Sequence, residues 1–400
     1  MKTLSPRQQS ALRGVAAASL DQLTSEMKVT PWMVSLPVWR WIGGRPAPRA
    51  AIVSAALFAV AVVVDDVPFG AHVLLRKAIA AVSIFLGLYG MFFAARQFEK
   101  IYAILKVLSR LPPDTMARAF TESVRPIFGS INTLPPAERA GFGPAQLLSR
   151  DPLLPGAYLG LATAICAYAL FATRLLPAPL SVGLVVQVLY DAAWALSFLW
   201  AGHFIVSLLP FITRIGRLPI QYFVGMPDSL SLKGVGGLFV ALAWGGSVHF
   251  WCVLGLLSSW DVLGPHPGED LRFTALVTFF TIALSGFYLL ELFVITLGTQ
   301  LVMSKTMLAY RSKRQAELAF HLEKLFDAYS RAPSSSALKE LQERLAQGEA
   351  VLSRLPWLSL SAPALLTFAL LAVADVAVLW LFVRSAVSVE RLTRLWQALN

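Results

Sequence analysis

The residues of this chain that could do chemistry are ionisable or polar side chains inside long apolar segments. An aspartate at the centre of a membrane helix costs roughly 2.5–3.5 kcal/mol on an insertion scale, so such groups usually face a cavity, an ion or a partner. The last four apolar segments each carry at least one such group, at different depths. The candidates for an ion or ligand pathway are Gln187, Asp191, His203, His249, Tyr288, Glu291 and Asp375.

Asp375 is the most isolated of these groups, because its segment has no other charged residue between Ala362 and Val383. Tyr288 and Glu291 follow a stripe of small hydroxyl residues that recur at helical spacing from Thr274 to Ser285. A stripe of this kind lines a polar path, or it forms hydrogen bonds between helices. Two interpretations therefore stay open, a route for a proton or small cation and a set of acids fixed by neighbouring side chains.

The motifs of enzymes and cofactor sites are absent from the sequence. There is no phosphate-binding glycine loop, no HExxH zinc motif and no GxSxG nucleophile turn. The two cysteines, Cys166 and Cys252, both lie in apolar segments, and the five histidines are scattered. We therefore expect no enzymatic activity, no cofactor and no metal site.

Composition places the chain in a lipid bilayer. Hydrophobic residues make up 56% of the chain and charged residues only 14%, whereas soluble domains carry about 25% charged residues. The mean hydropathy is +0.64. The net charge of +11 could indicate nucleic acid, but the basic residues lie between apolar segments, as the positive-inside rule predicts. We therefore expect a lipid partner and no nucleic acid.

The fold class expected from these segments is an all-α, polytopic bundle of about seven membrane spans. The predicted spans are 50–66, 73–95, 156–176, 180–211, 234–258, 272–300 and 362–383. Most of the 34 Lys and Arg residues fall in 1–49, 96–155, 213–233 and 301–360. This bias predicts a cytoplasmic N-terminus and a multi-pass protein of the plasma (inner) membrane. The amphipathic tail 385–400 carries two arginines and directly follows Arg384, so these basic residues are then outside, against the rule.

Five regions follow from these boundaries. Residues 1–49 form a cytoplasmic arm with an amphipathic helix, and 50–300 hold six spans and the cytoplasmic loop 96–155. Residues 301–360 form a cytoplasmic helical hairpin, 361–384 the final span and 385–400 the tail. In the loop, helical spacing continues to Leu111, Pro112 and Pro113 break it, and a short helix is predicted over Thr115–Ile127. Pro210 is expected to end the fourth span.

The predicted hairpin has apolar residues at helical spacing on both of its helices, Met303–Tyr329 and Ala337–Leu355. They are Leu318, Leu322, Leu325 and Tyr329 on the first helix, and Leu338, Leu341, Leu345, Gly348, Leu352 and Leu355 on the second. This seam resembles a coiled coil but is shorter than three heptads. It closes the hairpin on itself, or it serves as a device for homo-oligomerisation or partner docking through residues 303–355.

Two functions remain from the sequence. The first is a channel or transporter for a small cation or proton that uses the intramembrane acids and histidine. The alternative is a non-transporting membrane sensor or scaffold that binds a cytoplasmic partner through the hairpin. A lipid-modifying enzyme would need a nucleophile or metal site at the interface, and no such pattern is present.

Overall fold

The computed structural model describes residues 27, 29, 31, 42, 45–63, 71–128, 182–220, 231–262, 286, 290, 297–331, 335–354 and 360–386. The predicted span 156–176, nearly all of the predicted span 272–300 and residues 387–400 lie outside these ranges. The predicted amphipathic helix of the N-terminal arm also lies outside them.

The described elements are all α-helices, which confirms the all-α fold class. Their bounds are α4 Pro46–Val63, α5 Ala71–Leu108, α6 Pro113–Phe128, α10 Val182–Ile215, α11 Leu232–Val262, α13 Thr299–Arg331, α14 Ser335–Arg354 and α15 Ala362–Ala386. Within the described ranges, the only β-type pairing is one isolated bridge between Ser109 and Ile220.

Four of these helices contain segments long and apolar enough to cross a membrane. The segments are Pro46–Val63 in α4, Lys77–Leu108 in α5, Leu232–Cys252 in α11 and Ala362–Leu381 in α15. These segments identify a membrane protein by length and composition. The total of about seven spans and the side of the N-terminus remain predictions.

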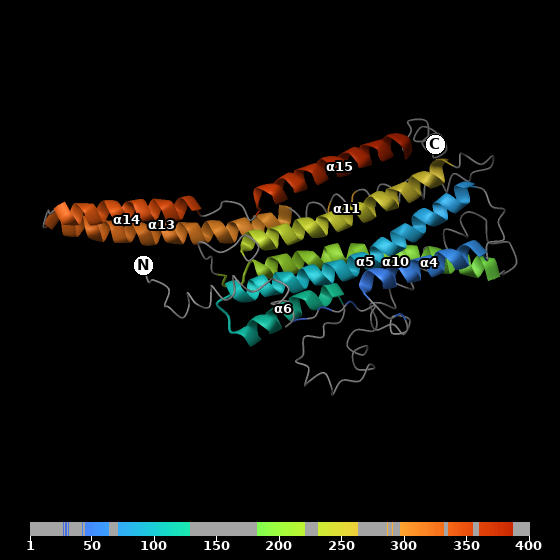
Figure 1. Cartoon of the computed structure of the whole chain (residues 1–400), viewed down its shortest axis with the longest axis horizontal. Helices are drawn as coiled ribbons and strands as arrows, with labels where there is room; N and C mark the ends of the chain where they lie inside the picture. The colour runs from blue at the N-terminus through green and yellow to red at the C-terminus, as the bar shows by residue number, and fades with distance from the viewer. Residues whose placement is uncertain are drawn as a thin grey trace, which may run out of the picture.

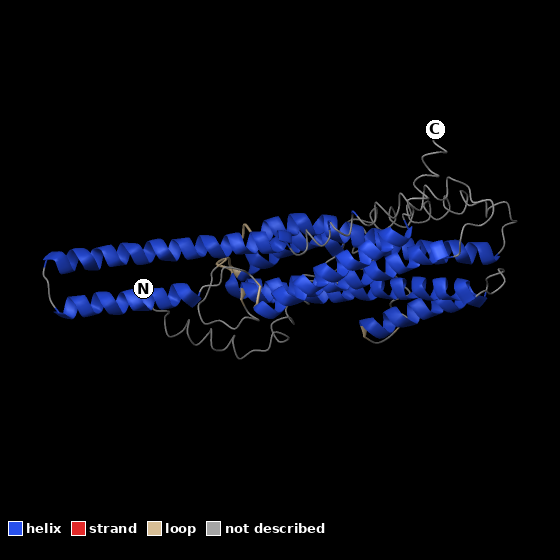
Figure 2. Ribbon diagram, turned by 90° about the horizontal axis from the view of Figure 1, so that it is seen from above, coloured by secondary structure: helices blue, strands red, loops and turns tan. Residues whose placement is uncertain are grey.

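The helices run side by side along the long axis of the molecule (Figure 1). α5 lies at the centre and contacts α4, α10 and α11, while α15 packs on α11. α13 and α14 contact each other and extend together from one end of this bundle, as both views show (Figure 2). The arrangement therefore has two parts, an apolar bundle and a projecting helix pair.

α5 is longer than a bilayer requires. Its 38 residues extend about 57 Å at 1.5 Å per residue. Its sequence has no charged residue from Ala78 to Ala95, so the turns that begin at Arg96 continue beyond the apolar part. α5 ends at Leu108, close to the predicted break at Pro112, and the predicted short helix is confirmed as α6.

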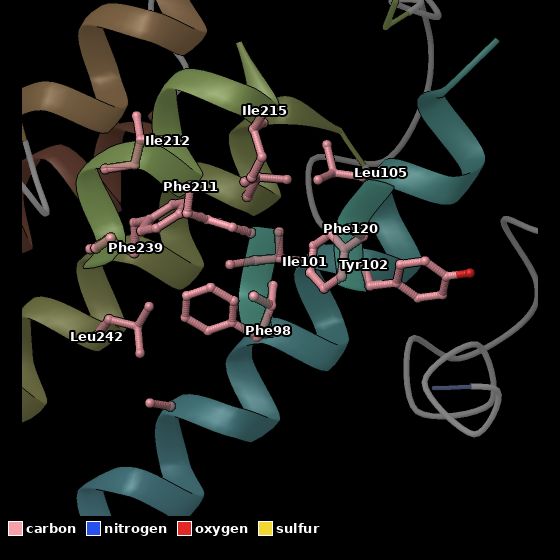
Figure 3. Packing of buried hydrophobic residues seen from close by; sticks show 14 of the residues in the cluster. Phe98, Ile101, Tyr102, Leu105, Phe120, Phe211, Ile212, Ile215, Phe239 and Leu242 are labelled. Atoms are coloured by element: carbon pink, nitrogen blue, oxygen red, sulfur yellow. The ribbon is translucent and has the colours of Figure 1, made fainter. Parts of the chain in front are cut away.

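A large buried apolar cluster of the described residues lies where these last turns of α5 meet α6, α10 and α11 (Figure 3). Phe98 of α5 contacts Phe211 of α10 with ring centroids 4.8 Å apart. Phe120 of α6 lies edge-on to the same Phe211 ring at 5.6 Å. All three side chains are buried, so the amphipathic helix α6 is held by the apolar face it turns toward α5 and α10.

Two polar contacts hold α6 where its own hydrogen bonds fail. Pro126 lies inside α6 and has no N–H to offer the carbonyl of Glu122 four residues earlier. Arg214 of α10 donates to that Glu122 carbonyl at 3.2 Å. His203 Nε2 lies 2.7 Å from the carbonyl oxygen of Pro126, which is itself in the last turn of α6. α10 thus binds two of the carbonyls that α6 leaves without a helical partner.

The prediction that Pro210 ends the fourth span is wrong. α10 continues through Pro210 to Ile215. The next residues, Phe211, Ile212 and Ile215, are all buried in the core, and their packing outweighs the one helical hydrogen bond that proline removes. The Thr213 hydroxyl donates to the Pro210 carbonyl at 2.8 Å.

Candidate intramembrane polar site

Asp375 joins the last helix to α11. The hydroxyl of Ser247 donates to Asp375 Oδ2 at 2.7 Å, and the indole Nε1 of Trp251 donates to Oδ1 at 2.8 Å. Ser247 and Trp251 are four residues apart on α11, which places them on one helix face one turn apart. Each carboxyl oxygen of Asp375 therefore has its own donor from the neighbouring helix.

This arrangement suits a carboxyl group in either protonation state. Asp375 is 6% exposed. A tryptophan N–H can only donate, whereas a serine hydroxyl can donate to a carboxylate or accept from a protonated acid. Asp375 can therefore take up or release a proton at Oδ2 and keep both contacts. Because unsatisfied polar groups inside a membrane are costly, these bonds also fix α15 on α11.

His249 lies on the opposite side of α11, toward α5. Its Nε2 is 3.4 Å from the hydroxyl of Ser83, which is long for a hydrogen bond. Both side chains are buried. Because residues 247, 249 and 251 lie within little more than one turn, α11 carries two polar contacts at one depth, one toward α5 and one toward α15. These five residues, Ser83, Ser247, His249, Trp251 and Asp375, form the polar layer.

The other predicted pathway residues are not brought into this layer by any described contact. His203 Nε2 contacts the carbonyl oxygen of Pro126 in α6. The Ser207 hydroxyl lies 3.3 Å from the same nitrogen. Gln187 and Asp191 lie on α10, but their side chains are outside the described part of the structure. Tyr288 and Glu291 are also outside it. The convergence of the predicted acids on one site therefore remains a prediction.

Sequence reasoning missed Ser83, Ser247 and Trp251, which complete the layer. For two of them the sequence offered one signal. Ser247 and Trp251 can both donate hydrogen bonds, and they lie one turn apart near the centre of α11. Nothing in the sequence indicates which helix they face.

Lys77 is a further buried ionisable group, which sequence reasoning did not assign to the candidate site. It is 5% exposed, and its Nζ donates to the carbonyl of Ala61 at 2.7 Å. Ala61 is in the last turn of α4, where helix carbonyls lack an internal partner and attract cations. The Tyr190 hydroxyl of α10 donates to the Lys77 carbonyl at 2.6 Å. Lys77 thus ties α4, α5 and α10 together at the end of the bundle opposite α13 and α14.

No group of three or more His, Cys, Asp and Glu residues among those described is placed to hold a metal ion. Comparisons with protein-family models, curated proteins and solved structures found no match to this chain. What the protein does must therefore be argued from its geometry.

Proposed function

We propose that this chain is a non-transporting membrane scaffold or sensor whose α13–α14 pair is the docking element for a cytoplasmic partner. The observation that carries the proposal is the pair itself. α13 has 33 residues, about 50 Å at 1.5 Å per residue, and its outer half is accompanied only by α14 among the described helices (Figures 1 and 2).

The surface of the pair supports docking. Phe320 is 54% exposed and Phe326 is 61% exposed, and both lie in a stretch whose charged residues mark it as water-facing. Aromatic residues are enriched at protein interfaces, where they contribute much of the binding energy. Two exposed phenylalanines on a projecting, charged helix therefore favour a binding role over a purely structural one.

The polar contacts between helices support a structural role for three of the predicted pathway residues. His203, His249 and Asp375 each face a partner on a neighbouring helix, in three separate contacts. Paired contacts of this kind are expected where polar groups hold a membrane bundle together. A rigid bundle is a suitable base for a projecting docking element.

Affinity capture after chemical cross-linking in native membranes tests the proposal. The bait is the full chain, compared with a variant that lacks residues 303–355 and with the double variant Phe320→Ser and Phe326→Ser. Proteins bound through the pair should be lost from both variants. The control is Ser312→Ala, which changes an exposed residue of α13 without removing an apolar side chain. Capture that is identical for all four baits would overturn the proposal.

The second candidate is transport of a proton or small cation, and Asp375 favours it. Its carboxyl group is the only charged group described in the α15 segment Ala362–Leu381, and its hydrogen bonds can persist through a protonation cycle. Purified protein in liposomes, compared with Asp375→Asn and Glu291→Gln, tests this candidate. Flux in the wild type that either variant abolishes would support transport. Absence of flux in the wild type and in both variants would overturn the transport candidate.

A further inference from the structure

The end of the bundle from which α13 and α14 project is strongly basic. The described residues 96–128, 211–220 and 231–233 lie at that end, and they carry nine Lys and Arg residues against three Asp and Glu residues. Basic residues close to a bilayer attract anionic lipid headgroups. This excess of positive charge therefore favours an anionic partner at that end of the bundle.

α6 lies at the depth of the lipid headgroups. Phe120 of α6 contacts Tyr102 of α5 with ring centroids 5.2 Å apart, and Phe128 contacts Phe98 at 5.3 Å, so α6 runs back along α5 toward the membrane (Figure 3). The apolar stretch of α5 ends at Ala95, and Phe98 and Tyr102 lie about 5 and 10 Å beyond it at 1.5 Å per residue. Headgroups extend roughly 5–8 Å beyond each side of the hydrocarbon core. The second half of α6 therefore lies among them.

All four ionisable side chains of α6 lie on its exposed face. Arg118, Glu122 and Arg125 are rotated by at most about 60° from one another. Asp114 lies in the same sector, at the end of α6 that is farther from the membrane, and all four are exposed. Arg214 of α10 joins this face, since it donates to the Glu122 carbonyl at 3.2 Å. We call Arg118, Arg125 and Arg214 the arginine cluster.

The arginine cluster has donors and charge to offer an anion. Within the described part of the chain, no Asp or Glu side chain forms an ion pair with Arg118 or Arg214. The carbonyl that Arg214 binds is uncharged, so this guanidinium keeps its charge and further N–H donors. Arginine presents its donors in a planar fork that matches two oxygens of a phosphate group. The cluster therefore has the chemistry of a phosphate site.

We propose that the arginine cluster binds the phosphate of an anionic phospholipid in the leaflet on the side of α13 and α14. The bilayer itself brings this ligand to the depth of α6, and the lipid tails stay in the hydrocarbon core. A phosphate held by Arg214 and by the arginines of α6 joins α10 to α6, close to the turn in which Pro126 removes a helical hydrogen bond. A lipid that binds only the folded protein stabilises it. The proposal does not depend on the docking role of the α13–α14 pair.

Titration of the purified full chain with phosphatidylglycerol in mild detergent tests the proposal. The readouts are the melting temperature and the number of lipids bound in native mass spectrometry. Phosphatidylglycerol should raise the melting temperature of the wild type more than phosphatidylcholine does. Arg118→Gln with Arg125→Gln leaves the Arg214 contact intact and should need roughly tenfold more phosphatidylglycerol for half-saturation. The matched control, Lys313→Gln with Arg331→Gln, removes two exposed basic residues of α13 and should bind as the wild type does.

Glu122→Gln gives a prediction of the opposite sign, which loss of folding could not imitate. It removes the carboxylate beside the cluster and keeps the backbone carbonyl that Arg214 binds, so half-saturation should need less phosphatidylglycerol than in the wild type. Equal effects of the two lipids on the wild type, or a half-saturation that neither the double arginine variant nor Glu122→Gln changes, would overturn the proposal. Inorganic phosphate is the third ligand to be compared. If it produces the same shift at the same concentration, the cluster binds free phosphate and the assignment to lipid is wrong.

Discussion

Gly87 and Gly90 stand one turn apart on α5 and have different surroundings. A Cβ on Gly87 would lie 2.6 Å from Cβ of Ser197 on α10, whereas a Cβ on Gly90 would have nothing within 4 Å. Gly87 therefore marks a close approach of α5 and α10, in the manner of small residues at membrane helix interfaces.

Alanine substitution should change the stability of the protein differently at these two glycines. Gly87→Ala should destabilise the protein by about 1–3 kcal/mol, since the added methyl group overpacks a close helix contact. Gly90→Ala should be neutral or stabilising by up to about 1 kcal/mol, because alanine favours the helix. Thermal unfolding of the purified protein in detergent measures both. Equal melting temperatures for the two variants would contradict the α5–α10 contact.

Asp375 allows a second comparison at this scale. In Asp375→Asn, the amide oxygen can still accept from Trp251 and the amide N–H can donate to Ser247 Oγ. Asp375→Leu leaves both partners unpaired, which should cost about 1–2 kcal/mol more than the asparagine variant. The measurement is again thermal unfolding in detergent. If Asp375→Leu is as stable as Asp375→Asn, the two hydrogen bonds do not hold α15 on α11.

The sequence predicted the position of Asp375 but not its partners. A lone charge in an apolar segment is visible in the sequence, because the membrane makes it exceptional. The rotation and register of α11 against α15 depend on side-chain packing between segments more than 120 residues apart. That information is not local, so Ser247 and Trp251 could not be assigned.

At the scale of elements, α6 shows how tertiary contacts replace a missing helical bond. Its limits were predicted closely, because the helix expected over Thr115–Ile127 follows the break at Pro112 and Pro113. By contrast, Pro210 was expected to end a helix that continues to Ile215. The local proline signal therefore set the start of α6. In α10 the burial of Phe211 and Ile212 outweighed the proline signal, and the helix continued past Pro210.

A double-mutant cycle tests the contact between α6 and α10. Arg214→Ala should increase hydrogen exchange in α6, because the Glu122 carbonyl then loses its donor. In a Pro126→Ala background, residue 126 regains an N–H that can bond Glu122, so the same arginine substitution should have a smaller effect. We expect a coupling free energy of about 0.5–1 kcal/mol. Additive effects on exchange would contradict the contact between Arg214 and Glu122.

At the scale of the whole molecule, the membrane bundle and the projecting pair have different surfaces. The bundle exposes large apolar residues such as Leu366, Leu370 and Val373 of α15. The pair exposes charged residues, including Arg314, whose pKa is raised by its hydrogen bond to the Tyr310 hydroxyl and by Glu317. This contrast predicts that lipid surrounds the bundle and water surrounds the pair.

The expected topology follows from this contrast and from the distribution of basic residues. The helix ends on the side of α13 and α14 include Arg110, Arg214 and Lys233, and the positive-inside rule assigns such a side to the cytoplasm. Val63, at the end of α4, is on the opposite side of the bundle and is 82% exposed. The proposed docking of a cytoplasmic partner requires the pair to stand in water on the inner side.

Site-directed labelling tests this requirement directly. Ser312→Cys on α13 and Val63→Cys on α4 are compared in a chain with both native cysteines replaced, with a maleimide that cannot cross membranes. We predict that Val63→Cys reacts in intact cells and that Ser312→Cys reacts only after the cells are permeabilised. Reaction of Ser312→Cys in intact cells, or of both positions from the same side, would contradict the account.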